Sequence, residues 1–187
     1  YNVGLVRRFA EILGEKNDAA RFGALYENIV AAFNDRYLDS ETGRYGTSTQ
    51  ASQAFPLYMG LAPDSARPKA LEVLVNDIAE RDGHLSTGLF ATKYTPDVLS
   101  SMGRHDIAYR MVNQRTFPGW GHMLENGATT LWEHWEGSDN TYSHNHPMFG
   151  SVSEWFFKHV AGIRPAPDAV GCDRVIIAPG PPPSDLG

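Results

Sequence analysis

The residues of this chain that could do chemistry are concentrated between Pro118 and Gly150. This stretch holds three of the four tryptophans and four of the seven histidines, together with many glycines. Glycine-rich segments favour loops, and the aromatic and polar side chains could line a cavity. The composition is therefore typical of a binding pocket rather than of plain helix packing.

A sugar is the ligand that this mixture of side chains suits. Carbohydrate rings have C–H faces that stack on tryptophan, and hydroxyl groups that hydrogen-bond to carboxylate, amide and imidazole groups. A 6-deoxy sugar adds a methyl group, which favours an aromatic wall. Glu133 lies between two of the tryptophans and could activate a water molecule beside a bound ring. Glu125, Glu136 and Asp139 are close in the sequence and could serve instead.

Other interpretations of the same residues stay open at this point. Tryptophans at this spacing also occur in cores, and Glu136 and Asp139 flank a Gly-Ser pair as in a solvated turn. His144 and His146 could place two imidazoles on one side of an extended segment and bind zinc, but no third ligand follows at a recognisable spacing. From the residues alone, Glu133 is a candidate base, and the zinc site is the weaker hypothesis.

The composition limits the class of protein. A chain of 187 residues is long enough for one compact domain, and its hydrophobic fraction of 42% and charged fraction of 20% are those of a globular protein. The formal net charge of −6 and the scattered basic residues argue against nucleic acid and against an anionic membrane surface. No apolar run approaches the length of a membrane span, and the single cysteine, Cys172, excludes an internal disulfide. No metal or cofactor is predicted.

The elements that must position these residues are helices almost throughout. Apolar residues recur at helical spacing, and Gly, Pro and capping residues mark the ends of the stripes. About seven helices are expected: one that ends at Gly14, one from a cap at Asn17 or Asp18 to Tyr37, one over Ser48–Met59 with Pro56 inside it, one capped by Asp64 that reaches Ile78, one from the N-cap pair Thr95-Pro96 to Gly103, a short one over Ile107–Val112, and one over Met148–Val160. His105 and His159 are expected on helix surfaces, and Glu154 is expected to be structural.

The character of the chain changes after Ile163. Residues 164–168 are predicted to form a linker, Arg174–Ala178 one β-strand, and residues 179–187 a disordered tail. A lone strand has no partner of its own, so it is expected to pair with a sheet outside this chain. Both ends of the chain are therefore expected to continue into a longer protein.

Five blocks of the sequence resemble the motifs of a known family. The most specific is Gly127-Ala-Thr-Thr-Leu-Trp-Glu-His-Trp, and it is followed by Asn145-His-Pro-Met-Phe-Gly-Ser-Val-Ser-Glu-Trp. Three shorter blocks begin at Gly83, Pro118 and Ala161, and all keep the family's order over most of the chain. These blocks resemble the signature of bacterial α-L-rhamnosidases of glycoside hydrolase family seventy-eight.

The resemblance implies an all-α fold. In this family an (α/α)6 toroid of antiparallel helix hairpins carries the active site, and a β-sandwich domain follows it. Residues 1–162 would then be the C-terminal part of the catalytic barrel. Residues 163–187 would contain a linker, the first strand of the following β domain and a disordered tail.

The resemblance also implies the reaction, which is the hydrolysis of terminal α-L-rhamnosyl residues from glycosides or polysaccharides with inversion of configuration. In such a reaction a carboxylic acid protonates the leaving oxygen while a carboxylate on the opposite face activates water, the two standing about 6.5–9.5 Å apart. By position, Glu133 matches the general base of the family. The residues expected to bind the sugar are Trp120, Trp132, Trp135, Asn145, His146 and His84.

The general acid of the family has no counterpart in this sequence. It lies earlier in the barrel, in an acidic loop that contains arginine, whereas Asp35-Arg36 and Glu80-Arg81-Asp82 stand at helix ends and in the wrong order. Loss of such catalysis typically lowers the rate about 10²–10⁴-fold. Part of a toroid also leaves apolar helix faces without partners. This chain alone is therefore expected to be weakly active or inactive, with the rest of the parent polypeptide as its partner.

Two other functions stay open. The chain could be a non-catalytic carbohydrate-binding or packing module derived from such an enzyme, although the intact Glu133 within a complete motif favours an enzyme. It could also belong to a toroid glycosidase for another sugar, such as L-fucose. The expected substrate is a rhamnose-containing glycan or plant glycoside. The aglycone, the bacterial compartment and the oligomeric state are left open.

Overall fold

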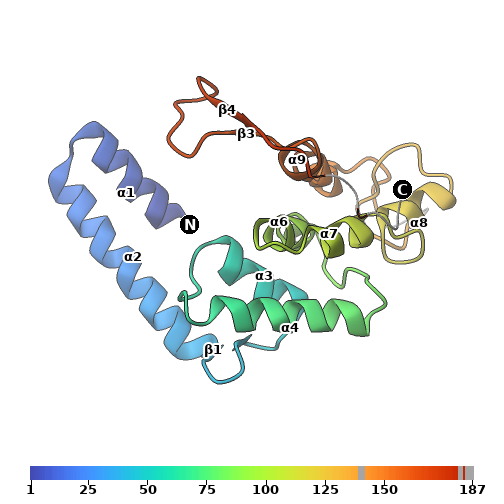
Figure 1. Cartoon of the computed structure of the whole chain (residues 1–187), viewed down its shortest axis with the longest axis horizontal. Coiled ribbons are helices and arrows are strands. Elements are labelled where there is room, and N and C mark those ends of the chain that lie inside the picture. The colour runs from blue at the N-terminus through green and yellow to red at the C-terminus, as the bar shows by residue number, and fades with distance from the viewer. Residues whose placement is uncertain (139–141, 181–182, 184–187) are drawn as a thin grey trace.

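The computed structural model describes residues 1–138, 142–180 and 183 of the chain. Helices dominate it (Figure 1). The α-helices are α1 (Asn2–Leu13), α2 (Lys16–Tyr37), α3 (Gln50–Tyr58), α4 (Arg67–Glu80), α5 (Leu89–Thr92), α6 (Tyr94–Ser101), α7 (His105–Val112), α8 (Trp120–Glu125) and α9 (Val152–Trp155). The other elements are the 3₁₀ turn η1 (Pro147–Ser151), the π-helical turn η2 (Phe156–Val160) and the strands β1 (Leu38–Asp39), β2 (Arg44–Tyr45), β3 (Ile163–Pro165) and β4 (Val175–Ile177). The prediction of a mainly helical architecture is confirmed.

Helices α1 and α2 form an antiparallel hairpin that reaches away from the other helices (Figure 1). Gly14 ends α1 at φ +76°, a left-handed conformation that glycine adopts without strain. Helix α2 begins before the predicted caps Asn17 and Asp18, and none of its residues is buried. Ile12 and Leu13 are 71% and 75% exposed. The hairpin therefore presents an apolar surface that the described part of the chain leaves uncovered.

The core lies where α3 packs against α4 and α6, and where α6 packs against α7. Its fully or almost fully buried side chains recur at helical spacing, and they include Leu57, Ala70, Leu74, Ile78, Leu99, Ala108 and Met111. The short hairpin of β1 and β2 leads from α2 toward α3. Thr49 caps α3 by accepting a hydrogen bond of 3.2 Å from the Ser52 amide. Pro56 lies inside α3, which ends at Tyr58.

Two predicted helix starts are wrong. Asp64 lies in the turn before α4, whose N-cap position is Ala66. Thr95 lies inside α6, where it is buried and its hydroxyl donates to the Ala91 carbonyl at 3.0 Å. A threonine oxygen can bond the carbonyl one turn earlier as well as an unpaired amide at a helix start. A threonine in the sequence therefore does not show whether it caps the start of a helix or lies inside the helix.

The last helical segment, expected as one helix over Met148–Val160, changes its winding twice. It begins as η1, continues as α9 and ends as η2. A π-helical turn holds more residues than an α-helical turn, so neighbouring side chains point in more similar directions. Lys158 and His159 both reach Asp97 of α6 from this turn.

The strand predicted near the C-terminus has a partner within the chain, which corrects the prediction of a lone strand. β4 pairs with β3 in antiparallel register, with Ile163 opposite Ile177. β3 overlaps the start of the predicted linker, where proline is compatible with an edge strand. Gly162 allows the hairpin to close, because a Cβ atom there would collide with the Ala178 carbonyl. The domain division at residue 162 stays a prediction, and most of the predicted disordered tail lies outside the described residues.

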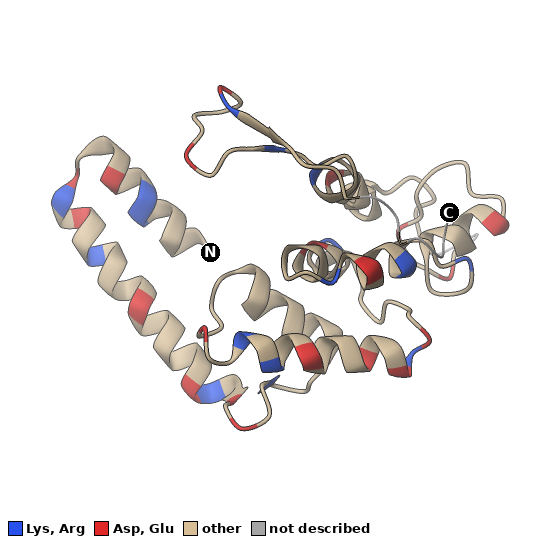
Figure 2. Ribbon diagram, in the orientation of Figure 1, with Lys and Arg blue, Asp and Glu red and all other residues tan. Residues whose placement is uncertain are grey.

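Charged residues of both signs are interspersed over the helices (Figure 2). This arrangement agrees with the scattered basic residues of the sequence. Within the described residues, no helix is both long and apolar enough to cross a membrane.

Candidate active site

Part of the most specific sequence block lies beside the start of the second block and the residues just before it. The Glu133 amide donates to the Ser143 carbonyl at 2.8 Å, and the His146 amide donates to the Leu131 carbonyl at 2.9 Å. Backbone hydrogen bonds therefore join the segment 131–133 to the segment 143–146. Glu133 and His146, the predicted base and a predicted sugar ligand, consequently belong to one local structure.

The Glu133 carboxylate completes this pairing. Its Oε2 atom accepts a hydrogen bond of 2.9 Å from the Ser143 amide. In a regular antiparallel pair, two opposite residues exchange both backbone hydrogen bonds, and here the side chain takes the place of the Glu133 carbonyl. The bond fixes one carboxylate oxygen, while Oε1 accepts no hydrogen bond from the described residues. This arrangement suits a base that is held by one oxygen and offers the other to water.

Asn145 and His146 continue the segment that pairs with Glu133. The Asn145 amide donates to the Ser143 hydroxyl at 3.1 Å, and the residue is exposed. His146 is partly buried, and its Nδ1 atom accepts a long hydrogen bond of 3.5 Å from the Met148 amide at the start of η1. A neutral imidazole that accepts at Nδ1 carries its proton at Nε2, where it could donate to a sugar hydroxyl.

Trp120 and Trp135 form an aromatic cluster with Phe149. The buried Trp135 ring stacks on Phe149 with centroids 3.8 Å apart, and its Nε1 donates to the Thr87 carbonyl at 2.8 Å. Trp120 meets the Trp135 ring edge-on at 5.2 Å and donates from Nε1 to the Phe149 carbonyl at 3.0 Å. Protein groups thus satisfy both indole N–H groups, and stacking of a sugar on either ring stays a prediction.

Trp132 is buried. Its ring lies against Gly137, where a Cβ atom would come within 2.7 Å of the indole. The ring helps to line a polar cavity of about 400 Å³, together with Asn126, Thr129, Thr130, Glu136, Ser138 and His144. A second, mainly apolar cavity of about 440 Å³ is lined in part by Trp120. Neither of these cavities is lined by Glu133.

His84 lies in the loop between α4 and α5, and both of its ring nitrogens have partners. Nδ1 is 2.9 Å from the Arg81 carbonyl, and Nε2 is 2.8 Å from the Thr116 hydroxyl. The same loop supplies the Thr87 carbonyl that binds the Trp135 indole. His84 therefore stands in a loop attached to the aromatic cluster, and its contact with a sugar stays a prediction.

The other carboxylates considered from the sequence are placed differently. Glu125 is exposed on α8 and forms an ion pair of 2.6 Å with an arginine. Glu136 is exposed as well, and Asp139 lies outside the described residues. Of the three candidates that the structure describes, Glu133 is the one whose carboxylate is bonded to the segment 143–146, which leads into the second sequence block.

The zinc alternative gains no support from the described residues. His144 Nε2 accepts a hydrogen bond of 3.4 Å from the Ser138 amide, and its carbonyl accepts one from the Thr130 hydroxyl. In the described part of the chain, no group of three or more His, Cys, Asp or Glu side chains is arranged to hold a metal ion.

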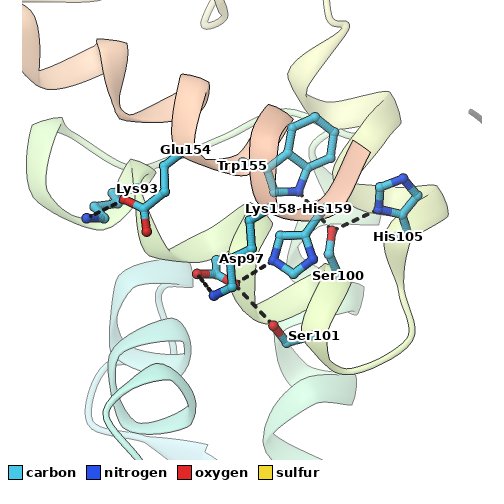
Figure 3. Close-up of polar contacts among 9 residues, drawn as sticks. All are labelled: Lys93, Asp97, Ser100, Ser101, His105, Glu154, Trp155, Lys158 and His159. Atoms are coloured by element: carbon cyan, nitrogen blue, oxygen red, sulfur yellow. Dashed lines mark hydrogen bonds and ion pairs between the residues drawn. The ribbon is translucent and has the colours of Figure 1, made fainter. Parts of the chain in front are cut away.

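A buried cluster around Asp97 is not predicted from the sequence (Figure 3). Asp97 is 6% exposed, and its carboxylate accepts hydrogen bonds from Lys158 Nζ at 2.7 and 2.8 Å and from His159 Nε2 at 2.7 Å. Burial raises the pKa of Asp97, but the hydrogen bonds from His159 and Lys158 outweigh it and lower the pKa from 3.8 to about 2. Nearby, Glu154 and Lys93 form an ion pair at 2.8 Å, in agreement with the structural role predicted for Glu154.

The prediction that His105 and His159 lie on helix surfaces is wrong. The His159 side chain is only 11% exposed because it binds Asp97. His105 stacks on Trp155 with ring centroids 5.5 Å apart, and the hydroxyl of Ser100 joins the two, 3.1 Å from His105 Nδ1 and 2.8 Å from the indole nitrogen (Figure 3). The sequence offers one signal for such a cluster, because Asp97 stands directly before the apolar residues Val98 and Leu99. An aspartate in such surroundings is expected to be buried, and buried carboxylates nearly always have a partner.

Comparison with protein families and with curated proteins gives a consistent result. A family model described as the bacterial alpha-L-rhamnosidase 6 hairpin glycosidase domain matches residues 1–160. An alpha-L-rhamnosidase of Streptomyces avermitilis is 38% identical over 189 residues, which cover 97% of this chain and 18% of that protein. An alpha-L-rhamnosidase of Formosa agariphila is 31% identical over 97% of this chain and 20% of that protein.

Solved structures agree with the sequence comparisons. The structure of an alpha-L-rhamnosidase from Dictyoglumus thermophilum matches with a TM-score of 0.91 and 40% identity, over 97% of this chain and 21% of that one. The crystal structure of the Streptomyces avermitilis alpha-L-rhamnosidase complexed with L-rhamnose matches with a TM-score of 0.90 and 38% identity, over 96% of this chain and 18% of that one. The chain thus spans about a fifth of the length of the relatives it matches.

Proposed function

Because this chain belongs to the bacterial α-L-rhamnosidase six-hairpin glycosidase family, we propose that it carries the water-activating side of an α-L-rhamnosidase active site. The reaction is the hydrolysis of terminal α-L-rhamnosyl residues from glycosides or polysaccharides. The chain covers about a fifth of its relatives, so in this proposal it acts as part of a longer polypeptide. The observation that carries the proposal is the hydrogen bond from the Ser143 amide to the Glu133 carboxylate, which ties the most specific sequence block to the segment that leads into the second block.

Glu133 is the proposed general base of an inverting mechanism. Its Oε1 atom takes a proton from a water molecule while the water oxygen attacks the anomeric carbon, and the bond from that carbon to the leaving oxygen breaks. The attack comes from the face opposite the leaving group, so the configuration is inverted. The bond from Ser143 to Oε2 supports this role because it keeps the carboxylate from rotating away from the water.

The general acid is proposed to come from another part of the polypeptide. Asp35 and Arg36 are exposed in the last turn of α2, and Arg81 at the end of α4 pairs with Asp77 at 3.0 Å. Both stretches stand at helix ends, as the sequence predicts, rather than in an acidic loop. The carboxyl pair that inversion needs, about 6.5–9.5 Å apart, is therefore complete only in the longer protein.

The sugar is proposed to contact residues near Glu133. Asn145 and His146 lie on the segment paired with it, where an amide and an imidazole N–H can bind hydroxyl groups. Trp132 lines the neighbouring polar cavity. The other proposed sugar-binding residues are Trp120, Trp135 and His84. The two tryptophans lie in the aromatic cluster, and His84 lies in the loop that is bonded to this cluster.

The rest of the polypeptide is the proposed partner of the exposed α1–α2 hairpin. Phe9, Ile12 and Leu13 of α1 and Leu25 and Ile29 of α2 are all more than two-fifths exposed. Exposed apolar patches of this kind mark interaction surfaces. In a toroid of six hairpins, each hairpin packs against its neighbours, and the proposal assigns this surface to the neighbouring hairpin.

The test is hydrolysis of aryl glycosides by the full-length polypeptide that contains this chain. The panel holds an α-L-rhamnoside, an α-L-fucoside and a β-D-glucoside, and cleavage of the rhamnoside alone is expected. Glu133→Gln keeps an oxygen that can accept from Ser143 but is not a base, so kcat is expected to fall by about 10²–10⁴-fold with unchanged circular dichroism. Proton NMR during the first minutes should show β-L-rhamnose before mutarotation.

Glu125→Gln is the matched control, because Glu125 is an exposed carboxylate in the same part of the chain. It is expected to keep the wild-type rate. If Glu133→Gln also keeps that rate, Glu133 is not the base. If no glycoside in the panel is cleaved, the chain is assigned as a non-catalytic binding module instead. If the fucoside is cleaved in place of the rhamnoside, the proposed sugar is L-fucose rather than L-rhamnose.

A further inference from the structure

Next to the bonded pair of Glu133 and Ser143, two aromatic rings are stacked across the same two segments. The rings of His134 and Tyr142 have centroids 4.6 Å apart and an interplanar angle of 11°. His134 follows Glu133 and Tyr142 precedes Ser143, so the two pairs stand in one antiparallel register. Neither ring belongs to the residues predicted to bind the sugar or to react.

The register changes on the other side of Glu133. Leu131 is bonded to His146, so that two residues, His144 and Asn145, oppose the single residue Trp132. Such a bulge loosens the ladder and bends the chain locally. The His134–Tyr142 stack bridges the two segments on the side of Glu133 away from the bulge.

The hydrogen bond at the Glu133 carboxylate depends on this local order. A glutamate side chain has several rotatable bonds, and its Oε2 atom meets the Ser143 amide at 2.9 Å only if the backbone of Ser143 stays at the right distance. Stacked aromatic pairs between opposite residues fix the separation of two strands. Tyr142 is 40% exposed, and its ring stacks on the ring of His134.

We infer that His134 and Tyr142 are positioning residues for Glu133. Their stack keeps the Ser143 amide aimed at Oε2 and thereby keeps Oε1 directed at the attacking water. The inference rests on the proposed function, since it needs Glu133 to be the base. It assigns no contact with the substrate to either ring, so their loss affects the chemical step more than substrate binding.

The test compares Tyr142→Ala and Tyr142→Phe in the full-length polypeptide with an aryl α-L-rhamnoside. Tyr142→Ala is expected to lower kcat by about 10- to 100-fold, because a displacement on the order of 1 Å has effects of this size, while KM stays near the wild-type value. Tyr142→Phe keeps the ring and is expected to retain kcat. The control Tyr37→Ala removes an aromatic residue of similar exposure (46%) that contacts Phe33, and it is expected to leave kcat unchanged.

Hydrogen exchange gives a readout that does not depend on turnover. Mass spectrometry of a peptide that spans residues 142–146 is expected to show faster amide exchange in Tyr142→Ala and wild-type exchange in Tyr142→Phe. If Tyr142→Ala keeps the wild-type kcat, or if Tyr142→Phe loses as much activity as Tyr142→Ala, the inference is wrong. A wild-type rate in Glu133→Gln overturns the proposed function and this inference together. A dead Glu133→Gln beside a fully active Tyr142→Ala overturns the inference alone.

Discussion

The carboxylate of Asp97 stays charged inside the protein because cationic partners bind it. Its pKa of about 2 lies below the 3.8 of an unperturbed aspartate, so the folded state binds this proton less tightly than the unfolded state. The resulting stabilisation is complete above about pH 4 and is lost as the pH falls toward 2. It amounts to about 2 kcal/mol for this shift.

Asp97→Asn is therefore expected to lower the free energy of unfolding by about 3 kcal/mol at pH 7, since it removes the negative charge that pairs with Lys158 and His159. This loss of stability is at the lower end of the range for a broken buried ion pair, because about a third of the Lys158 side chain is exposed to water. The variant is also expected to lose less stability than the wild type between pH 5 and pH 2. Chemical denaturation followed by circular dichroism measures both effects.

Asp106→Asn serves as the control for Asp97→Asn. Asp106 forms an ion pair of 3.2 Å with Arg104 at the surface, and such pairs contribute less than about 1 kcal/mol. If the two variants lose similar stability at pH 7, the Asp97 cluster does not have the strength that its burial indicates.

At the scale of residues, the sequence predicts chemistry better than it predicts surroundings. Glu133 can be put forward from its place between two tryptophans and His146 from the family resemblance, and backbone hydrogen bonds join the segments that carry them. The prediction for His159 is wrong because helical spacing identifies a face without saying what covers it. Its partner Asp97 lies on a different helix, and neither residue type specifies the other.

At the scale of elements, local signals decide which boundaries are predictable. Gly14 and Gly103 end helices at positive φ, a conformation that glycine adopts readily, so both ends can be predicted. The cap predicted at Thr95 is wrong because its hydroxyl bonds an earlier carbonyl instead of a helix amide. β3 is not predictable because its own residues, with a proline, resemble a linker rather than a strand.

The C-terminal hairpin depends on Gly162 for two separate reasons. Its φ of +67° is strained for other residues, and a Cβ atom would meet the Ala178 carbonyl. Gly162→Ala is expected to detach β4, with faster hydrogen exchange over residues 175–180. Gly171→Ala is the matched control: Gly171 has the same φ of +67°, but a Cβ atom there would have no neighbour within 4 Å, so it tests backbone strain alone, about 1–2 kcal/mol. Equal exchange in the two variants would show that the collision is unimportant.

At the scale of the whole molecule, the proposal puts the base in this chain and the acid elsewhere in the polypeptide, and it therefore predicts a low activity for this chain alone. The 187-residue chain is expected to cleave an aryl α-L-rhamnoside about 10²–10⁴-fold more slowly than the full-length polypeptide. Initial rates at equal molar concentration measure the difference. Equal rates would place a working general acid within these residues and would contradict the proposed division of the catalytic groups.

The double use proposed for the Glu133 side chain constrains how this family could evolve. Because the carboxylate also replaces a backbone acceptor for Ser143, most substitutions at this position would disturb the loop as well as the reaction. Glutamine is the exception, since it keeps an acceptor oxygen at the same length, and a single base change converts a glutamate codon into a glutamine codon. A descendant that lost hydrolysis but still bound rhamnose would therefore be expected to pass through glutamine at residue 133.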